Sequence, residues 1–243
     1  MKTLILGCSF CSTLAEDKPE QWKLNPDVTV RAISGTGNEA LAARTIYECA
    51  RVAYDRVIVI WTGINRLDAR IPRILHETYP GAKQEQPEYS FCTPLQSEVW
   101  YHSGGILGSW TTDKTCPRAI SQYFKNQYLA ATANYMCDIS LAAIATTQHF
   151  LTASGITYEM SFIYDIAQDY SDIDNGRWEN VLGKVISSGP YFDLVDWHKI
   201  KTDTTPYEWA KHNASRLEND QFHPTRDAMR TWILDNFFID IAA

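Results

Sequence analysis

The sequence has no apolar run long enough to cross a bilayer and no excess of basic residues. A membrane-spanning helix needs roughly 20 apolar residues, and a secretory signal needs a core of roughly 7–15. The first apolar run stops at Gly7, after too few residues for either. The formal net charge is -7, whereas binding to nucleic acids or anionic membranes requires a basic surface. We therefore expect a protein that is cytoplasmic at synthesis and binds neither nucleic acids nor membranes. A phage-encoded protein that is delivered on a virion is an alternative that these observations leave open.

The cysteines give no sign of a disulfide framework, and no metal-binding pattern is complete. The six cysteines are scattered over 243 residues and form no dense disulfide framework. Cys8 and Cys11 form a CxxC motif, but no second pair of ligands follows at the spacing that a zinc site normally needs. We interpret both as small buried packing residues and expect no metal and no cofactor. A metal or redox protein that depends on this motif is the rival interpretation.

Short apolar segments in the first quarter of the chain predict parallel strands. Strands are predicted at residues 3–8, 28–33 and 56–61, and the third is a continuous β-branched run typical of a strand covered on both faces. Apolar residues at helical spacing predict a helix over 38–54, with Asn38 as its N-cap. Strand–helix–strand alternation produces parallel crossover units. The fold class is therefore predicted to be α/β.

The second half of the chain continues this alternation. We predict a helical region over 121–154, with at most one break, that stops at Gly155. Strands follow at 156–163 and 191–196. The final helix is predicted to begin near Thr225 and to bury the following apolar side chains: Met229, Trp232, Ile233 and Phe237.

One domain, residues 1–243, is the simplest organisation for a chain of this length. Residues 66–120 interrupt the pattern of strands and helices, with weak periodicity and several aromatic residues. Long irregular segments inside a domain are often lids or binding loops. We therefore expect an inserted loop or lid over 66–120.

Chemically active residue types follow the predicted strands. Ser9 follows the first strand, Gly35 the second and Asn65 the third, while Asp220 and His223 precede the final helix. The carboxyl ends of parallel strands meet at one edge of a sheet, so these residues are expected to lie close together.

A serine hydroxyl needs a base, a group that orients the base and donors for the developing oxyanion. His223 is the candidate base, and Asp220, three residues earlier, can orient it. The backbone N–H groups of Ser9 and Gly35 and the side-chain amide of Asn65 would supply three donors. Gly37 is a rival to Gly35, because Gly35-Thr36-Gly37 offers two flexible positions.

These segments resemble the sequence blocks of the SGNH (GDSL-type) hydrolase superfamily. The matching segments, in the family's order, are Gly7-Cys8-Ser9-Phe10, Ile33-Ser34-Gly35, Gly63-Ile64-Asn65-Arg66 and Asp220-Gln221-Phe222-His223-Pro224. The α/β-hydrolase family does not fit, because its nucleophile motif has Gly at the position of Cys11. The resemblance departs at Cys8 and Arg66, where the family has Asp residues that support the loops.

The resemblance implies a three-layer α/β/α sandwich with a mostly parallel, flavodoxin-like sheet. It also implies ester hydrolysis through an acyl-serine intermediate. It makes Ser9, His223 and Asp220 the catalytic residues and places Ser9, Gly35 and Asn65 in the oxyanion hole. The expected partner is a small-molecule or glycan ester.

Carbohydrate O-deacetylation is the preferred subclass, because the family often performs it and the 66–120 insert is aromatic. Trp100, Tyr101 and Trp110 would either stack on a sugar ring or close a small core of the insert. Arg66 would either bind a substrate carboxylate or form a structural contact. The alternative function is a non-catalytic binding protein, or a virion or surface structural protein, that retains the SGNH fold. The oligomeric state is left open.

Overall fold

The computed structural model describes residues 1–15, 27–32, 35–64, 66–72, 98–102, 118–164, 189–212 and 223–238. Its centre is a five-stranded sheet in the order β2-β1-β3-β6-β7, in which every described pairing is parallel. The strands are β1 (Thr3–Gly7), β2 (Val28–Ala32), β3 (Arg56–Trp61), β6 (Thr157–Phe162) and β7 (Ile200–Lys201). Numbered within the sheet, this is the 2-1-3-4-5 order of flavodoxin-like folds.

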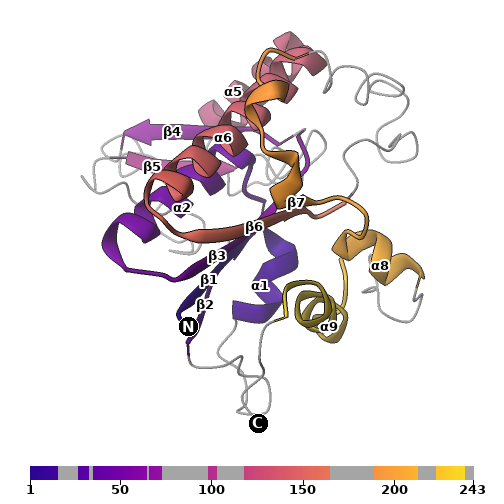
Figure 1. Ribbon diagram of the computed structural model, residues 1–243. Helices are drawn as coiled ribbons and strands as arrows, with labels where there is room; N and C mark the ends of the chain where they lie inside the picture. The colour runs from indigo at the N-terminus through magenta and orange to yellow at the C-terminus, as the bar shows by residue number, and fades with distance from the viewer. Residues whose placement is uncertain are drawn as a thin grey trace.

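Helices cover both faces of the sheet, which makes a three-layer α/β/α sandwich (Figure 1). On one face, α2 (Asn38–Arg51) packs against α6 (Ala133–Ala153), which follows α5 (Arg118–Ala130). On the other face, α1 (Ser9–Ala15) packs beside α9 (Arg226–Phe237), and α8 (Pro206–His212) packs against α9. The predicted fold class is therefore confirmed. None of the described helices combines the length and the apolar composition that a membrane-spanning segment needs.

The burial of the strands explains the apolar runs from which they were predicted. Every residue of β1 and β3 is buried, whereas β2 at the edge of the sheet is only partly buried.

The predicted helical region over 121–154 is two helices, separated at residues 131–132, and Thr132 caps the second by accepting the N–H of Tyr135. Gly155 then takes a left-handed conformation (φ 67°), as a C-terminal stop requires.

The predicted strand at 191–196 is wrong. Phe192–Leu194 forms a short 3-10 helix, η3, and Trp197–Lys199 forms a second, η4. The side chain of Gln148 on α6 binds both the N–H and the carbonyl of Asp196, so these backbone groups pair with a helix rather than with β6. The fifth strand is β7, which pairs with Met160 and Ser161 of β6.

The described residues of the 66–120 insert include two strands. β4 (Asp68–Pro72) pairs antiparallel with β5 (Glu98–His102), which sequence periodicity did not reveal. Residues 73–97 and 103–117, on which the predicted lid depends, lie outside the described residues. The described part of the insert is therefore a two-stranded ribbon that follows β3, together with the first three residues of α5.

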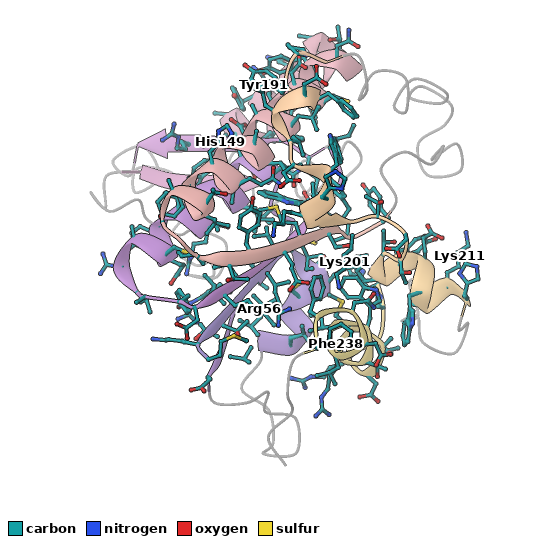
Figure 2. The ribbon with its side chains drawn as sticks, in the orientation of Figure 1. Arg56, His149, Tyr191, Lys201, Lys211 and Phe238 are labelled. Atoms are coloured by element: carbon teal, nitrogen blue, oxygen red, sulfur yellow. The ribbon has the colours of Figure 1, made fainter. Side chains whose placement is uncertain are left out.

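The last helix is anchored along its length, as the sequence predicted. Met229, Trp232, Ile233 and Phe237 are all fully buried. The Trp232 indole N–H donates to the carbonyl of Thr204 at 3.1 Å. At the C-terminal end of α9, the Lys201 ammonium binds the carbonyl of Asn236 and lies 4.7 Å from the centroid of the Phe237 ring. Figure 2 labels Lys201 and Phe238, whose ring centroid is 5.9 Å from the same ammonium. A cation at a helix C-terminus is favourable because it faces the negative end of the helix dipole.

Trp232→Ala is expected to lower the free energy of unfolding by about 3–5 kcal/mol, because the change leaves a large cavity between α9 and the sheet. Urea denaturation followed by circular dichroism measures the change. Leu194→Ala is the control: this side chain is exposed, so the expected change is within about 0.5 kcal/mol. Equal effects of the two substitutions would contradict the packing described for α9.

Candidate active site

Ser9 lies at the carboxyl end of β1, at the sharp turn into α1. The turn brings Cys11 back onto the end of the strand, with its N–H donating to the carbonyl of Cys8 at 2.9 Å. A Cβ atom on Gly7 would lie 2.3 Å from the Sγ atom of Cys11. Glycine at position 7 is therefore what permits the first turn of α1 to start so close to the strand and to present Ser9 at the sheet edge.

The structure brings Ser9 and His223 together. The Oγ atom of Ser9 lies 2.9 Å from the Nε2 atom of His223, although the residues are 214 positions apart in the chain. His223 lies three residues before α9, which packs beside α1. The ring of Phe10 meets the His223 ring edge-on, with centroids 5.1 Å apart. The packing of two helices and an aromatic contact thus position the imidazole over the hydroxyl.

The geometry of this pair suits proton transfer from serine to histidine. A hydrogen bond from the Ser9 hydroxyl to Nε2 requires that His223 carry its own proton on Nδ1. Asp220, the residue predicted to hold that proton in place, lies outside the described residues. Ser9 is half-buried, so its hydroxyl is partly shielded from water without being sealed inside the core.

The two glycines after β2 differ in what they can offer. Gly35 is buried and adopts a left-handed conformation (φ 76°), which favours glycine. The N–H of Gly37 donates to the Oδ1 atom of Asp68 at 2.8 Å. Since the Gly37 N–H is already engaged, Gly35 remains the candidate oxyanion donor of this pair. Asn65, the candidate side-chain donor, lies outside the described residues.

The predicted N-cap of α2 is wrong by one residue. Gly37 occupies the cap position, and Asn38 is the first helical residue. The Asn38 side chain instead accepts the N–H of Thr62 at 2.9 Å and donates to the Thr62 carbonyl at 3.3 Å. It therefore connects the start of α2 to the segment that follows β3.

Asp68 is the residue that the sequence analysis missed. Its carboxylate accepts the N–H groups of Gly37 and Ala40, both at 2.8 Å. Asp68 therefore caps α2 although it belongs to β4, a strand that is not adjacent to the helix in sequence. Sequence signatures of helix caps use residues adjacent to the helix. Asp68 is 31 residues from Gly37, so no local pattern identifies it.

The proposed substrate-binding residues have different surroundings. Trp100 in β5 is buried, with 6% of its surface exposed, and packs against Ala40 and Ala43 of α2. Of the two alternatives for this ring, packing is therefore the one observed, although its partner is α2 rather than a core within the insert. Tyr101 pairs with Ala69 in the β4–β5 ladder. Trp110 lies outside the described residues.

Arg66 makes a contact within the protein. Its guanidinium donates to the carbonyl of Thr36 at 3.5 Å. This contact joins the segment after β3 to the segment after β2, which agrees with a structural role. It stands at the position where the resembled family has an Asp that supports the same loops.

The CxxC motif has the surroundings of packing residues. Cys8 and Cys11 are both fully buried. Burial and the neighbouring Cys8 raise the pKa of the Cys11 thiol well above its ordinary value. Because the thiolate is the form that binds metals and undergoes redox exchange, this environment disfavours the rival interpretation of the motif. Among the described residues, no three His, Cys, Asp or Glu side chains are grouped to hold a metal ion.

Comparisons with solved structures found a GDSL-like lipase from Bacteroides thetaiotaomicron and a putative acylhydrolase from Bacteroides fragilis. The lipase is 12% identical, with a TM-score of 0.48 over 96% of this chain and 85% of the other. The acylhydrolase is 12% identical, with a TM-score of 0.44 over 98% of this chain and 88% of the other. No protein-family model and no curated protein matches the sequence. The fold assignment follows from the strand order and does not depend on these likenesses.

Gly7→Ala is expected to lower the free energy of unfolding by about 1–3 kcal/mol, because the added methyl group overlaps the Cys11 Sγ atom. The double variant Gly7→Ala/Cys11→Ala removes that sulfur and should recover part of the loss. Urea denaturation of both single variants and the double variant gives the coupling energy. Strictly additive effects would show that the contact between positions 7 and 11 is not the cause.

Proposed function

We propose that this protein is a serine ester hydrolase of the SGNH (GDSL) type, acting through an acyl-serine intermediate. The observation that carries the proposal is the 2.9 Å contact between Ser9 Oγ and His223 Nε2 at the carboxyl edge of a parallel sheet. A hydroxyl paired with an imidazole is the arrangement that converts a weak nucleophile into a reactive one. The order of the sequence blocks along the chain supports the same family.

In the first half of the proposed reaction, His223 Nε2 takes the hydroxyl proton as Ser9 Oγ bonds to the ester carbonyl carbon. The carbonyl oxygen becomes an oxyanion. When the intermediate collapses, the bond to the alcohol oxygen breaks, and the histidine returns its proton to that oxygen. In the second half, water attacks the acyl-serine, with His223 taking the water proton and then protonating Ser9 as it leaves. Asp220 is proposed to hold the Nδ1 proton.

The oxyanion is proposed to be bound by the N–H groups of Ser9 and Gly35 and by the Asn65 side chain. Gly35 is supported by its buried left-handed backbone and by the engagement of the rival Gly37 N–H with Asp68. Donors that are already in place stabilise developing charge without reorganising during the reaction. The reaction requires no metal or cofactor.

A small acyl ester is the proposed substrate, and carbohydrate O-acetyl groups are the preferred subclass. The aromatic composition of the 66–120 insert supports a glycan. Within that insert, Trp100 is excluded from sugar stacking by its burial against α2, so the proposal falls on Tyr101 and Trp110. The net charge of -7 argues against binding to nucleic acids or anionic membranes, so neither is a proposed partner. The proposed location is the cytoplasm at synthesis.

A fluorophosphonate probe is expected to add one phosphonyl group to the wild-type protein, detectable by intact-protein mass spectrometry. Ser9→Ala should give no adduct, because the nucleophile is gone. His223→Ala should react roughly 10²–10⁴-fold more slowly, because the base is gone. Cys11→Ser is the matched control, since it changes a nearby buried side chain outside the proposed machinery and should label like wild type.

Labelling of folded Ser9→Ala as fast as wild type would show that the reactive group is another residue. Circular dichroism of each variant establishes that it is folded. An unlabelled wild-type protein that also hydrolyses no ester would contradict the proposed function and favour a binding protein with this fold.

Short acyl chains are expected to react fastest. We expect kcat/KM for p-nitrophenyl acetate to exceed that for the octanoate ester, and we expect release of acetate from an O-acetylated oligosaccharide. Acetate release is measured with a coupled assay, with Ser9→Ala as the blank. A preference for octanoate over acetate would contradict the proposed acyl group, and no acetate release would contradict the glycan subclass.

A further inference from the structure

The Asp68 carboxylate holds the loop that carries Gly35. Asp68 is 8% exposed, and its two oxygens accept the N–H groups of Gly37 and Ala40 at 2.8 Å each. Both N–H groups lie at the start of α2, where backbone donors have no partner within the helix. The positive end of the helix dipole also favours an anion there. This carboxylate therefore fixes the junction between the loop and α2.

The contact requires glycine at position 37. A Cβ atom there would lie 2.7 Å from the Asp68 Oδ2 atom and 2.9 Å from the carbonyl oxygen of Arg66. The backbone of Gly37 (φ -93°, ψ 180°) is one that other residues adopt readily. The close approach of the carboxylate, rather than backbone strain, thus accounts for this glycine.

Two further contacts join the same two segments. Asn38 binds the backbone of Thr62, and Arg66 binds the carbonyl of Thr36. Each of these contacts links a residue within 36–38 to a residue within 62–68, as the Asp68–Gly37 bond also does. Hydrogen bonds therefore join the segment after β2 to the segment after β3 at three places. Asp68 contributes most to this connection, because it accepts two backbone N–H groups.

We propose that Asp68 is a positioning residue for the oxyanion hole. It acts through Gly37, two residues beyond Gly35, and so sets where the Gly35 N–H lies relative to Ser9. Oxyanion donors are effective only when held at hydrogen-bond distance from the developing charge. This inference rests on the proposed function and assigns to it a residue that the sequence blocks do not contain.

Other charged groups near Asp68 supply a control. Glu39 lies in the first turn of α2 with an exposed side chain, whereas the bonds to Gly37 and Ala40 are made by Asp68. Partial desolvation of its carboxylate and the Asp68 charge raise the pKa of Glu39, whereas Arg70 lowers it. Glu39→Gln therefore makes the same carboxylate-to-amide change as Asp68→Asn, on the same charge cluster, without removing the bonds to Gly37 and Ala40.

The test is steady-state hydrolysis of p-nitrophenyl acetate by the full chain. In Asp68→Asn, one amide oxygen remains to accept, while the amide NH₂ faces a second N–H donor and repels it. We expect kcat to fall about 10- to 100-fold, somewhat less than the roughly 10²–10³-fold that follows deletion of a donor. KM should stay within about twofold, and the pH at half-maximal kcat/KM should not move, because the Ser9–His223 pair is untouched.

Two controls separate positioning from stability. Glu39→Gln should retain wild-type kcat. Val57→Ala leaves a small cavity at the amino end of β3, the end of the strand opposite the site, and should lower the melting temperature without changing kcat. Gly37→Ala, which displaces the carboxylate sterically, should reproduce the loss of kcat and tests the same contact if Asp68→Asn does not fold. The double variant should lose no more than the worse single variant.

The outcomes distinguish this inference from the function on which it rests. Wild-type hydrolysis with undiminished kcat in folded Asp68→Asn would overturn the positioning role and leave the proposed function standing. Losses that match those of Glu39→Gln, or that add fully in the double variant, would also overturn it. Absence of hydrolysis and of fluorophosphonate labelling in wild type would overturn both.

Discussion

The parallel pairing of β1 with β2 and β3 is the constraint on which the whole site depends. Gly7 of β1 pairs with Ala32 of β2, and Leu6 pairs with Val59 of β3, so the three strands end at the same edge of the sheet. The segments that carry Ser9, Gly35 and Thr62–Gly63 leave the sheet there, although they come from separate parts of the chain. Every backbone hydrogen bond of the ladder contributes to this alignment, and a shift of one residue would move Ser9 away from its neighbours.

The base comes from the other end of the chain, and apolar packing determines its position. α9 lies beside α1 on one face of the sheet (Figure 1) because its buried side chains fill the space between the helix and the sheet. Trp232 fixes the middle of α9 through the Thr204 carbonyl, and Lys201 fixes its end through the Asn236 carbonyl. His223, just before α9, is thereby brought to 2.9 Å from Ser9. A polar contact of the site is thus positioned by interactions that are mostly non-polar.

The parts that were predictable from sequence are those with local signals. Buried strands such as β3 appear as continuous β-branched runs, and the stripe of α9 appears at helical spacing, so the fold class and the approach of Ser9 to His223 followed. The fifth strand was not predictable, because Gln148 of α6 engages the backbone of Asp196 and β7 has only two residues. Asp68 was missed because its partners, Gly37 and Ala40, are distant from it in sequence. From the sequence alone, the Trp100 ring could stack on a sugar. Its contact with α2 could not be predicted, because the tertiary fold brings the two together.

In the proposed reaction, Ser9 is activated by His223 and bonds to the ester carbonyl carbon, while the Gly35 N–H binds the oxyanion. The most direct measurement is a crystal structure of the protein after reaction with a fluorophosphonate. We expect phosphorus bonded to Ser9 Oγ, His223 Nε2 still beside that oxygen, and a phosphoryl oxygen about 2.7–3.1 Å from the Gly35 N–H. An adduct on a different residue, or a phosphoryl oxygen directed away from Gly35, would contradict it.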